Sequence, residues 1–528
     1  MKKKIGVFCF VISTMLFFSF MPFLFADQVS EIRIGDGKGD WGYPNPFGHY
    51  PRGPGYIRMS WVFDTLIWKD QNGYVPALAE SWSYDPDRMA FTFHLNPNAK
   101  WHDDQPVTAE DVTFTIDFFK KHPYHWISVE DVARASAQGT HKVVVYLSKP
   151  YSPFLSDFGG TRPTMPIHIW QWVDNPGTYH DPGAFIGSGP YRFMDFNKTQ
   201  GTYLYEAFDD YYQGRPKVDR IIYIRAGQPL VSLSNGQVDL SNIQSDMAEH
   251  LRQKGLVIIK DERGWNKKLM INHKKTPFSD KRFRHALAFA IDQQEVIDKS
   301  HRGFGAPASY GLLSIDHDMY NPDTPTYEYN PEKVRSLMEA MGYRKDLDGF
   351  YQKDGKPLKI ELLSSNITVA GQSIVDRDGE VIKKQLEQVG IRIDLVNLEQ
   401  ATTDSKVRNW DFDLVVSGHG GISGDAKILN EMISSKYGEG SVNSARYDIS
   451  PELNRLLDEQ MLEMDDDLRK TIVQSIQKVY AEELPAISLY YPDSLSAYNP
   501  DKGIVWFYTK GGISKGIPIS QNKMALIR

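Results

Sequence analysis

Cysteine is almost absent from this 528-residue chain, and its one cysteine lies in an unfavourable place for chemistry. Cys9 falls inside an apolar run near the N-terminus and follows the bulky Phe8. A lipoprotein signal needs a small residue before a cysteine at the end of such a run, so lipidation is not expected. Without another thiol, the rest of the chain has neither disulfide bonds nor a cysteine nucleophile.

Clustered positive charge is also missing beyond the first residues. The formal net charge is −7 at pH 7, and loss of the three N-terminal lysines would take it to −10. Proteins that bind nucleic acid carry clustered Lys and Arg that meet the phosphates. The composition therefore argues against nucleic-acid binding.

Motifs of the common hydrolases and metal sites are missing as well. There is no His-Glu-x-x-His sequence, and the stretch 421–424 lacks the spacing of a Gly-x-Ser-x-Gly nucleophile turn. Asp346 begins a stretch like a calcium loop, but Pro357 stands where the twelfth-position glutamate is needed. We therefore expect a protein that is not an enzyme and has no cofactor, with a periplasmic hydrolase as the remote alternative.

One long apolar run is present, and it lies at the N-terminus. Three lysines precede the run from Ile5 to Phe25, which ends at Ala26 before Asp27. This pattern predicts a secretory signal cleaved after Ala26, with an uncleaved membrane anchor as the alternative. The remaining chain of about 500 residues is too long for one hydrophobic core and suggests two or three domains.

The two halves of the chain differ in their patterning. A capping box at Thr108 predicts a helix in the first half, which is otherwise richer in strands. A single helix is expected over 279–298, and another begins at Asn330. From Leu358 onward strands and helices alternate, which predicts a parallel sheet with helices on its faces. Because ligands of such sheets lie beyond the carboxyl ends of strands, the loop 417–425 after Val416 is the best candidate site.

Several motifs in order along the chain resemble those of the extracellular solute-binding proteins of family 5, the peptide- and nickel-binding group. Each motif alone is weak, but six in family order over about 300 residues make a specific signal. They are Val62-Phe63-Asp64-Thr65-Leu66, Pro76-Ala77-Leu78-Ala79-Glu80-Ser81-Trp82, Trp101-His102-Asp103-Asp104-Gln105-Pro106-Val107-Thr108-Ala109-Glu110-Asp111-Val112, Gly187-Ser188-Gly189-Pro190-Tyr191, Phe278-Ser279-Asp280-Lys281-Arg282-Phe283-Arg284-His285-Ala286-Leu287-Ala288-Phe289-Ala290-Ile291-Asp292, and Asn330-Pro331-Glu332-Lys333 with Met341-Gly342-Tyr343.

The resemblance implies an α/β, two-lobed periplasmic-binding-protein fold with mixed sheets flanked by helices. Lobe I would comprise residues 27–65, 185–270 and 485–528, with an extra subdomain at 66–184, and lobe II would comprise 271–484. The chain would cross between the lobes near 270 and 485. It also implies a monomeric periplasmic protein that closes over a solute and delivers it to the permease of an ABC importer.

The ligand is where the sequence departs from the family pattern. In peptide-binding members the loop after the lobe II strand resembles Gly-Trp-x-x-Asp, and the aspartate pairs with the ammonium of the peptide. Aligned without gaps, this chain has His419 in place of the tryptophan and Ile422 in place of the aspartate. A slip of three residues would instead bring Asp425 into that role.

Three classes of ligand remain open at this point. The first is a peptide or peptide-like solute held through its backbone or by Asp425. The second is a nickel or other metal chelate, for which His419 is the candidate metal ligand. The third is an oligosaccharide or another neutral solute stacked on aromatic side chains, with Trp41, Tyr43, Trp265 and Trp410 as candidates.

Overall fold

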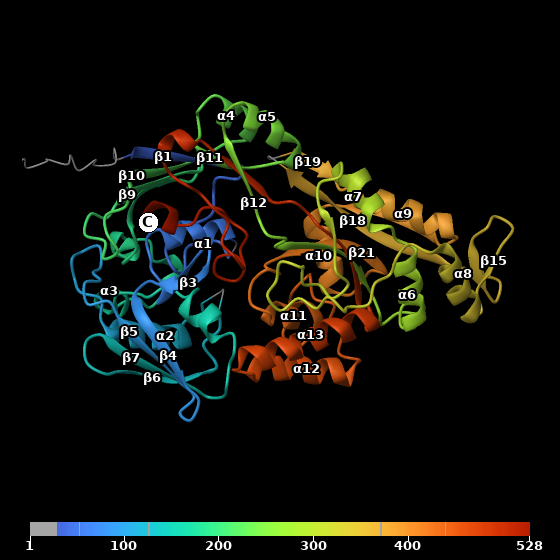
Figure 1. Ribbon diagram of the computed structural model, residues 1–528, viewed down its shortest axis with the longest axis horizontal. Coiled ribbons are helices and arrows are strands. Elements are labelled where there is room, and N and C mark those ends of the chain that lie inside the picture. The colour runs from blue at the N-terminus through green and yellow to red at the C-terminus, as the bar shows by residue number, and fades with distance from the viewer. Residues whose placement is uncertain (1–28, 52, 125–126, 370–371, 439, 528) are drawn as a thin grey trace, which may run out of the picture.

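Two seven-stranded sheets form the centres of two lobes, which lie side by side in Figure 1. The computed structural model describes residues 29–527 except 52, 125–126, 370–371 and 439. The signal expected at residues 1–26 lies outside the described residues. Within the described residues, no helix combines the length and the apolar character needed to cross a membrane.

Lobe I is built on a mixed sheet that draws its strands from both ends of the chain. Its central strand β1 is parallel to β10 and β11, while the outer strands pair antiparallel. Buried aromatic residues, including Trp61, Tyr205 and Tyr223, fill the core beside it. In sheet order the strands are β12 (Val257–Lys260), β23 (Leu495–Tyr498), β11 (Leu240–Ile243), β1 (Val29–Asp36), β10 (Val218–Arg225), β9 (Thr202–Ala207) and β8 (Tyr191–Asn197).

The extra subdomain of lobe I is a four-stranded antiparallel sheet with helix α2 against it. The capping box expected at Thr108 is present, since the Asp111 carboxylate accepts the Thr108 N–H at 2.8 Å. The subdomain has a hydrophobic core of its own. Its elements are β4 (Ala79–Asp85), β5 (Ala90–Leu95), α2 (Ala109–Lys121), β6 (Val132–Ala137), β7 (Lys142–Leu147), a short π-helix η1 (Leu155–Gly159) and α3 (Ile167–Trp170), with the hairpin β2 (Ile67–Asp70) and β3 (Gly73–Pro76) nearby.

Lobe II carries the parallel unit expected from Leu358 onward, because β18 is parallel to both β20 and β21. On the other side of β21, β13 and β22 continue the sheet antiparallel. The strands are β13 (Trp265–Ile271), β14 (Ala306–Pro307), β18 (Lys359–Val369), β19 (Gln372–Val375), β20 (Arg392–Leu398), β21 (Leu414–Gly420) and β22 (Ala486–Tyr491), and a small separate sheet contains β15 (Arg344–Lys345), β16 (Tyr351–Lys353) and β17 (Lys356–Pro357).

The helix expected over 279–298 is in fact two helices. The Asp280 carboxylate accepts the Arg282 N–H and begins the first, and the Asp292 carboxylate accepts the Glu295 N–H and begins the second. The helices of lobe II are α6 (Lys281–Phe289), α7 (Gln293–His301), α8 (Pro331–Ala340), α9 (Asp378–Val389), α10 (Gln400–Arg408), α11 (Lys427–Ile433), α12 (Pro451–Leu462) and α13 (Asp466–Glu483); α1 (Gly53–Ser60), α4 (Pro229–Ser234), α5 (Ala248–Gln253) and α14 (Met524–Ile527) belong to lobe I.

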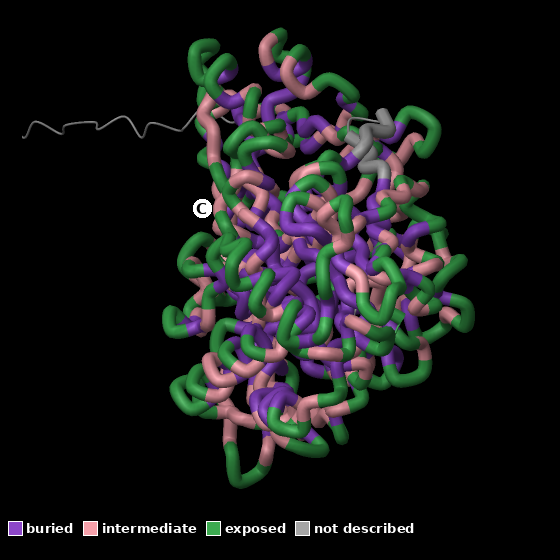
Figure 2. The backbone as a smooth tube through the Cα atoms, turned by 90° about the vertical axis from the view of Figure 1, so that its right-hand side faces the viewer, coloured by how far each residue is buried: buried purple, intermediate pink, exposed green. Residues whose placement is uncertain are grey.

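The chain crosses between the two sheets twice, a few residues away from the expected positions of 270 and 485. Because β13 and β22 pair within the sheet of lobe II, the crossings lie at 261–264 and 492–494. After the second crossing the C-terminal segment packs back onto the core of lobe I, where Trp506 is buried. Figure 2, seen from the lobe II side, shows buried backbone running through the middle of the molecule and exposed backbone in the peripheral loops.

Candidate functional site

The boundary between the lobes contains a strand edge without a strand partner. All seven residues of β21 face β13, but on its other side β21 pairs with β18 only through Leu414 and Val415. Beyond that point β18 pairs with β20 and with its own hairpin strand β19. Within the described residues, no strand pairs with this side of β21 from Val416 to Gly420.

The loop after β21 touches lobe I directly. The N–H of Gly421 donates to the Gly264 carbonyl in the first crossing at 2.9 Å. A Cβ on Gly424 would lie 2.7 Å from the Cα of Gly516, which belongs to the C-terminal segment. Only glycines permit so close a backbone approach, so the loop is shaped to meet the C-terminal segment when the lobes are together.

Ile422 lies in the hydrophobic core of lobe II. Its side chain is fully buried in an apolar cluster of lobe II with Leu312, Leu429 and Leu457. Burial in this cluster gives the apolar side chain a structural role and does not support the expectation that Ile422 binds the ligand. Residue 422 is the position that the gap-free alignment gives to the aspartate of peptide-binding members, so at that position this chain has an apolar side chain and no carboxylate.

Asp425 has a partner within its own lobe. Arg469 of α13 forms a bidentate ion pair with it, at 2.6 Å from Nη2 to Oδ1 and 2.9 Å from Nη1 to Oδ2. The Lys427 N–H also donates to Oδ1 at 2.8 Å. Burial alone would raise the pKa of Asp425, but Arg469 and these hydrogen bonds lower it to about 2. Its charge is therefore already compensated without a ligand.

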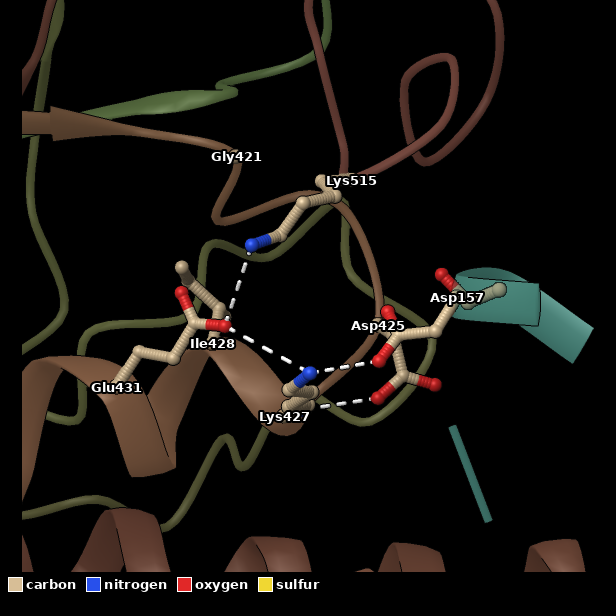
Figure 3. Close-up of a pocket in the computed structure, with 8 residues that line it drawn as sticks. Asp157, Gly421, Asp425, Lys427, Ile428, Glu431 and Lys515 are labelled. Atoms are coloured by element: carbon tan, nitrogen blue, oxygen red, sulfur yellow. Dashed lines mark hydrogen bonds and ion pairs between the residues drawn. The ribbon is translucent and has the colours of Figure 1, made fainter. Parts of the chain in front are cut away.

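A small polar pocket lies between the lobes beside this ion pair (Figure 3). Its cavity volume is about 20 Å³, room for little more than a water molecule, and it is partly open to solvent. Lys427 of lobe II reaches Asp157 of the extra subdomain, with Nζ at 2.6 Å from Oδ2, and Tyr151 Oη at 3.1 Å. The lining residues are Ser156, Asp157, Gly421, Asp425, Lys427, Ile428, Glu431 and Lys515.

Sequence reasoning missed this ion pair between the lobes. Lys427 is the first residue of α11, where the helix dipole favours an acid over a cation. A lysine at the start of a helix was therefore the local feature that could have indicated an acidic partner. Its partner Asp157 lies 270 residues earlier in the chain, so no local pattern could identify it.

The aromatic candidates in lobe I are engaged within that lobe. The Trp41 indole N–H donates to Asp36 at 2.8 Å, and the Lys38 ammonium lies 4.4 Å from its ring centre. Tyr43 stacks on His180, with ring centres 4.2 Å apart and Phe196 at its edge. These contacts give both residues structural partners, and neither lines the pocket of Figure 3.

The aromatic candidates in lobe II lie at opposite ends of one strand pair. Trp265 is 42% exposed and faces Gly420, next to the crossing. Trp410 precedes the other end of β21, about 20 Å away along the strands, and packs on His273 and Phe412. The structure therefore separates Trp410 from Trp265 and from the loop after β21.

His419 lies on β21 opposite Asn266 and is partly exposed. Among the described residues, no group of three or more His, Cys, Asp or Glu side chains is arranged to hold a metal ion. A lone imidazole can bind a metal only together with donors from a bound chelator. Any role of His419 with a metal would therefore depend on the ligand.

Comparison with known proteins shows to which family the chain belongs. The family model of the bacterial extracellular solute-binding proteins, family 5, matches residues 73–441. The chain belongs to this family. The two-lobed architecture with two crossings agrees with that membership, and members of the family are solute-binding transport proteins.

Relatives of this family 5 protein cover most of its length at low identity. Oligopeptide-binding protein AppA of Bacillus subtilis is 26% identical over 79% of the chain and 78% of its own length, and heme-binding protein A of Haemophilus influenzae is 24% identical over 80% of both. NikA from Brucella suis in complex with Fe(III)-EDTA has a TM-score of 0.78 at 21% identity, covering 93% of this chain and 99% of its own. AppA from Bacillus subtilis in complex with a nonapeptide has a TM-score of 0.73 at 22% identity, covering 92% and 97%. The solved structures show a shared fold.

Proposed function

We propose that this family 5 protein binds an extended, peptide-like solute between its lobes, without chemical change, and delivers it to the permease of an ABC importer. The unpaired edge of β21 from Val416 to Gly420 is the observation that carries this proposal. Such an edge presents backbone donors and acceptors that an extended chain can pair with. Sugars lack the regular spacing of amide groups that this edge matches.

Recognition through the backbone explains why no acid is needed for a peptide ammonium. Ile422 is buried in the core, and Asp425 is paired with Arg469. A ligand that pairs with β21 forms its hydrogen bonds with the backbone of the strand, and its end groups contribute less to the affinity than its backbone does. Blocked or internal peptide segments are therefore suitable ligands.

Lobe closure supplies the signal for transport. The loop at Gly421 and Gly424 and the ion pair between Lys427 and Asp157 join the lobes only when they approach. A permease that recognises both lobes in this arrangement would receive the loaded protein. We place the protein in the periplasm, after cleavage of the signal at Ala26.

A carboxylate-bearing solute such as a metal chelate is the second candidate, and Arg162 is the observation that favours it. This side chain is 4% exposed, and its Nε and Nη1 have no hydrogen-bond partner in the described structure. Burial lowers the pKa of Arg162 to about 9, because the low-dielectric surroundings disfavour its charge. A bound carboxylate would restore the missing partner.

Methylating single backbone amides of a bound peptide tests the proposed pairing. Peptides captured from a tryptic digest and identified by native mass spectrometry supply the probe. In an added strand, the N–H groups of every second residue point toward β21. We therefore expect N-methylation of these amides to weaken binding about tenfold or more, and methylation of the amides between them to have little effect. Uniform tolerance would contradict pairing with β21. Retention of metal chelates instead of peptides would favour the second candidate.

A further inference from the structure

The ammonium of Lys427 lies where a positive charge is unfavourable unless carboxylates surround it. Its side chain is four-fifths buried and begins α11, whose N-terminal dipole repels positive charge. Two carboxylates compensate for this: Asp157 at 2.6 Å and Glu431 at 3.9 Å from Nζ. The ammonium is therefore the central cation of an acidic pocket.

The acids around Lys427 come from both lobes. Asp157 lies in η1 of the extra subdomain, is itself 7% exposed, and also accepts the Tyr151 hydroxyl. Glu431 lies one turn along α11 and is 3.5 Å from the Lys515 ammonium of the C-terminal segment. Figure 3 shows Lys427 between these carboxylates. Removal of Lys427 would leave Asp157 buried and without its ion-pair partner.

The pocket lies where one end of a ligand on β21 would arrive. Gly421 directly follows β21 and lines the pocket with Asp157 and Lys427. An extended chain that pairs with Val416 to Gly420 would bring one of its ends to this place. There it would meet the Lys427 ammonium, which lies between Asp157 and Glu431.

We propose that Lys427 is a built-in substitute for a ligand ammonium: it fills the acidic pocket at the end of β21 and thereby makes a free amine unnecessary in the solute. The position along β21 rests on the proposed function, whereas the filled pocket does not. Lys427 is thus a specificity-determining residue. Shortening it should create a site for a primary ammonium ion.

The test is rescue of Lys427→Ala by small amines in the absence of any peptide. Truncation to Ala leaves room for most of the lysine stem and its ammonium. We expect the variant to melt at least about 5 °C below the wild type and ethylammonium chloride at about 50 mM to restore half of that loss or more. Tetramethylammonium has no N–H group and should not restore it.

Two matched variants separate rescue from general salt effects. Lys427→Met removes the charge but fills the space, so ethylammonium should not stabilise it. Lys436→Ala removes an exposed lysine paired with Asp458, and its melting temperature should not respond to amines either. The wild type should be equally unresponsive, because its site is occupied.

Equal effects of ethylammonium and tetramethylammonium on Lys427→Ala would overturn the inference, as would rescue of Lys436→Ala. If Lys427→Ala must be refolded from denaturant, a higher folded yield with ethylammonium supports the inference. Equal folded yields with and without ethylammonium contradict the inference. It is also contradicted if Lys427→Ala folds in neither buffer while Lys427→Met does fold. Because no peptide is present, this result is independent of the ligand, and failure to bind peptides would overturn only the proposed function.

Discussion

Replacing Arg469 by methionine is expected to lower the free energy of unfolding by about 3 kcal/mol, because it leaves the largely buried Asp425 without its ion-pair partner. Arg469 also donates to the side-chain oxygen of Gln460 at 3.0 Å, and this hydrogen bond is lost as well. Urea denaturation at neutral pH measures the change. Asp425 would then be established as a structural residue instead of a ligand anchor.

The pH dependence of Arg469→Met has a definite sign. In the wild type the pKa of Asp425 is lowered to about 2, so its stabilising contribution is complete above pH 4 and is lost as the pH falls toward 2. In the variant, burial without Arg469 raises that pKa, so the penalty is present at neutral pH and is relieved on acidification. Arg455→Met, which removes an exposed pair with Glu459 on α12, should change stability by less than about 0.5 kcal/mol. A loss below 1 kcal/mol in Arg469→Met would contradict the assigned role.

Replacing Lys523 by methionine is the other change with a large expected effect, about 3–5 kcal/mol. Lys523 pairs with Asp64 across a fully buried contact, and its ammonium lies 4.0 Å from the centre of the Trp68 ring. Tyr211 and Tyr212 donate to the other oxygen of Asp64 at 3.0 and 2.8 Å. Two phenols cannot neutralise a buried carboxylate once its cation is removed.

Lys523 joins the C-terminal segment to the core of lobe I, so its loss should also loosen that segment. Amide hydrogen exchange should rise across residues 504–527 in Lys523→Met and remain near wild type in lobe II. Lys149→Met, which breaks an exposed pair with Asp131, is the control and should change neither quantity. A stable variant with unchanged exchange would show that the buried pair contributes little.

Local signals in the sequence predicted much of the fold. The capping box at Thr108 and the helix start at Asn330 are both present, because each depends on hydrogen bonds within a few residues. The break between α6 and α7 was missed. Apolar periodicity continues across Asp292, so the pattern alone does not show that its carboxylate begins a new helix.

The site was less predictable because its contacts join distant segments. Asp425 and Ile422 were chosen by their position after a strand, but their roles depend on Arg469 and on the leucine cluster of lobe II. Trp410 was chosen only as an aromatic side chain that could stack on a neutral solute, and it precedes the end of β21 remote from the loop. The pairing of Lys427 with Asp157 joins segments 270 residues apart and has no local motif.

Calorimetry on one peptide sequence, with a free N-terminus and N-acetylated, tests the central claim most directly. We expect the two forms to bind within a factor of about three of each other, since Asp425 is already paired with Arg469 and the proposed pairing with the β21 edge uses the backbone. A protein with a buried carboxylate anchor would lose about 2–5 kcal/mol on acetylation. A loss of that size here would contradict the account.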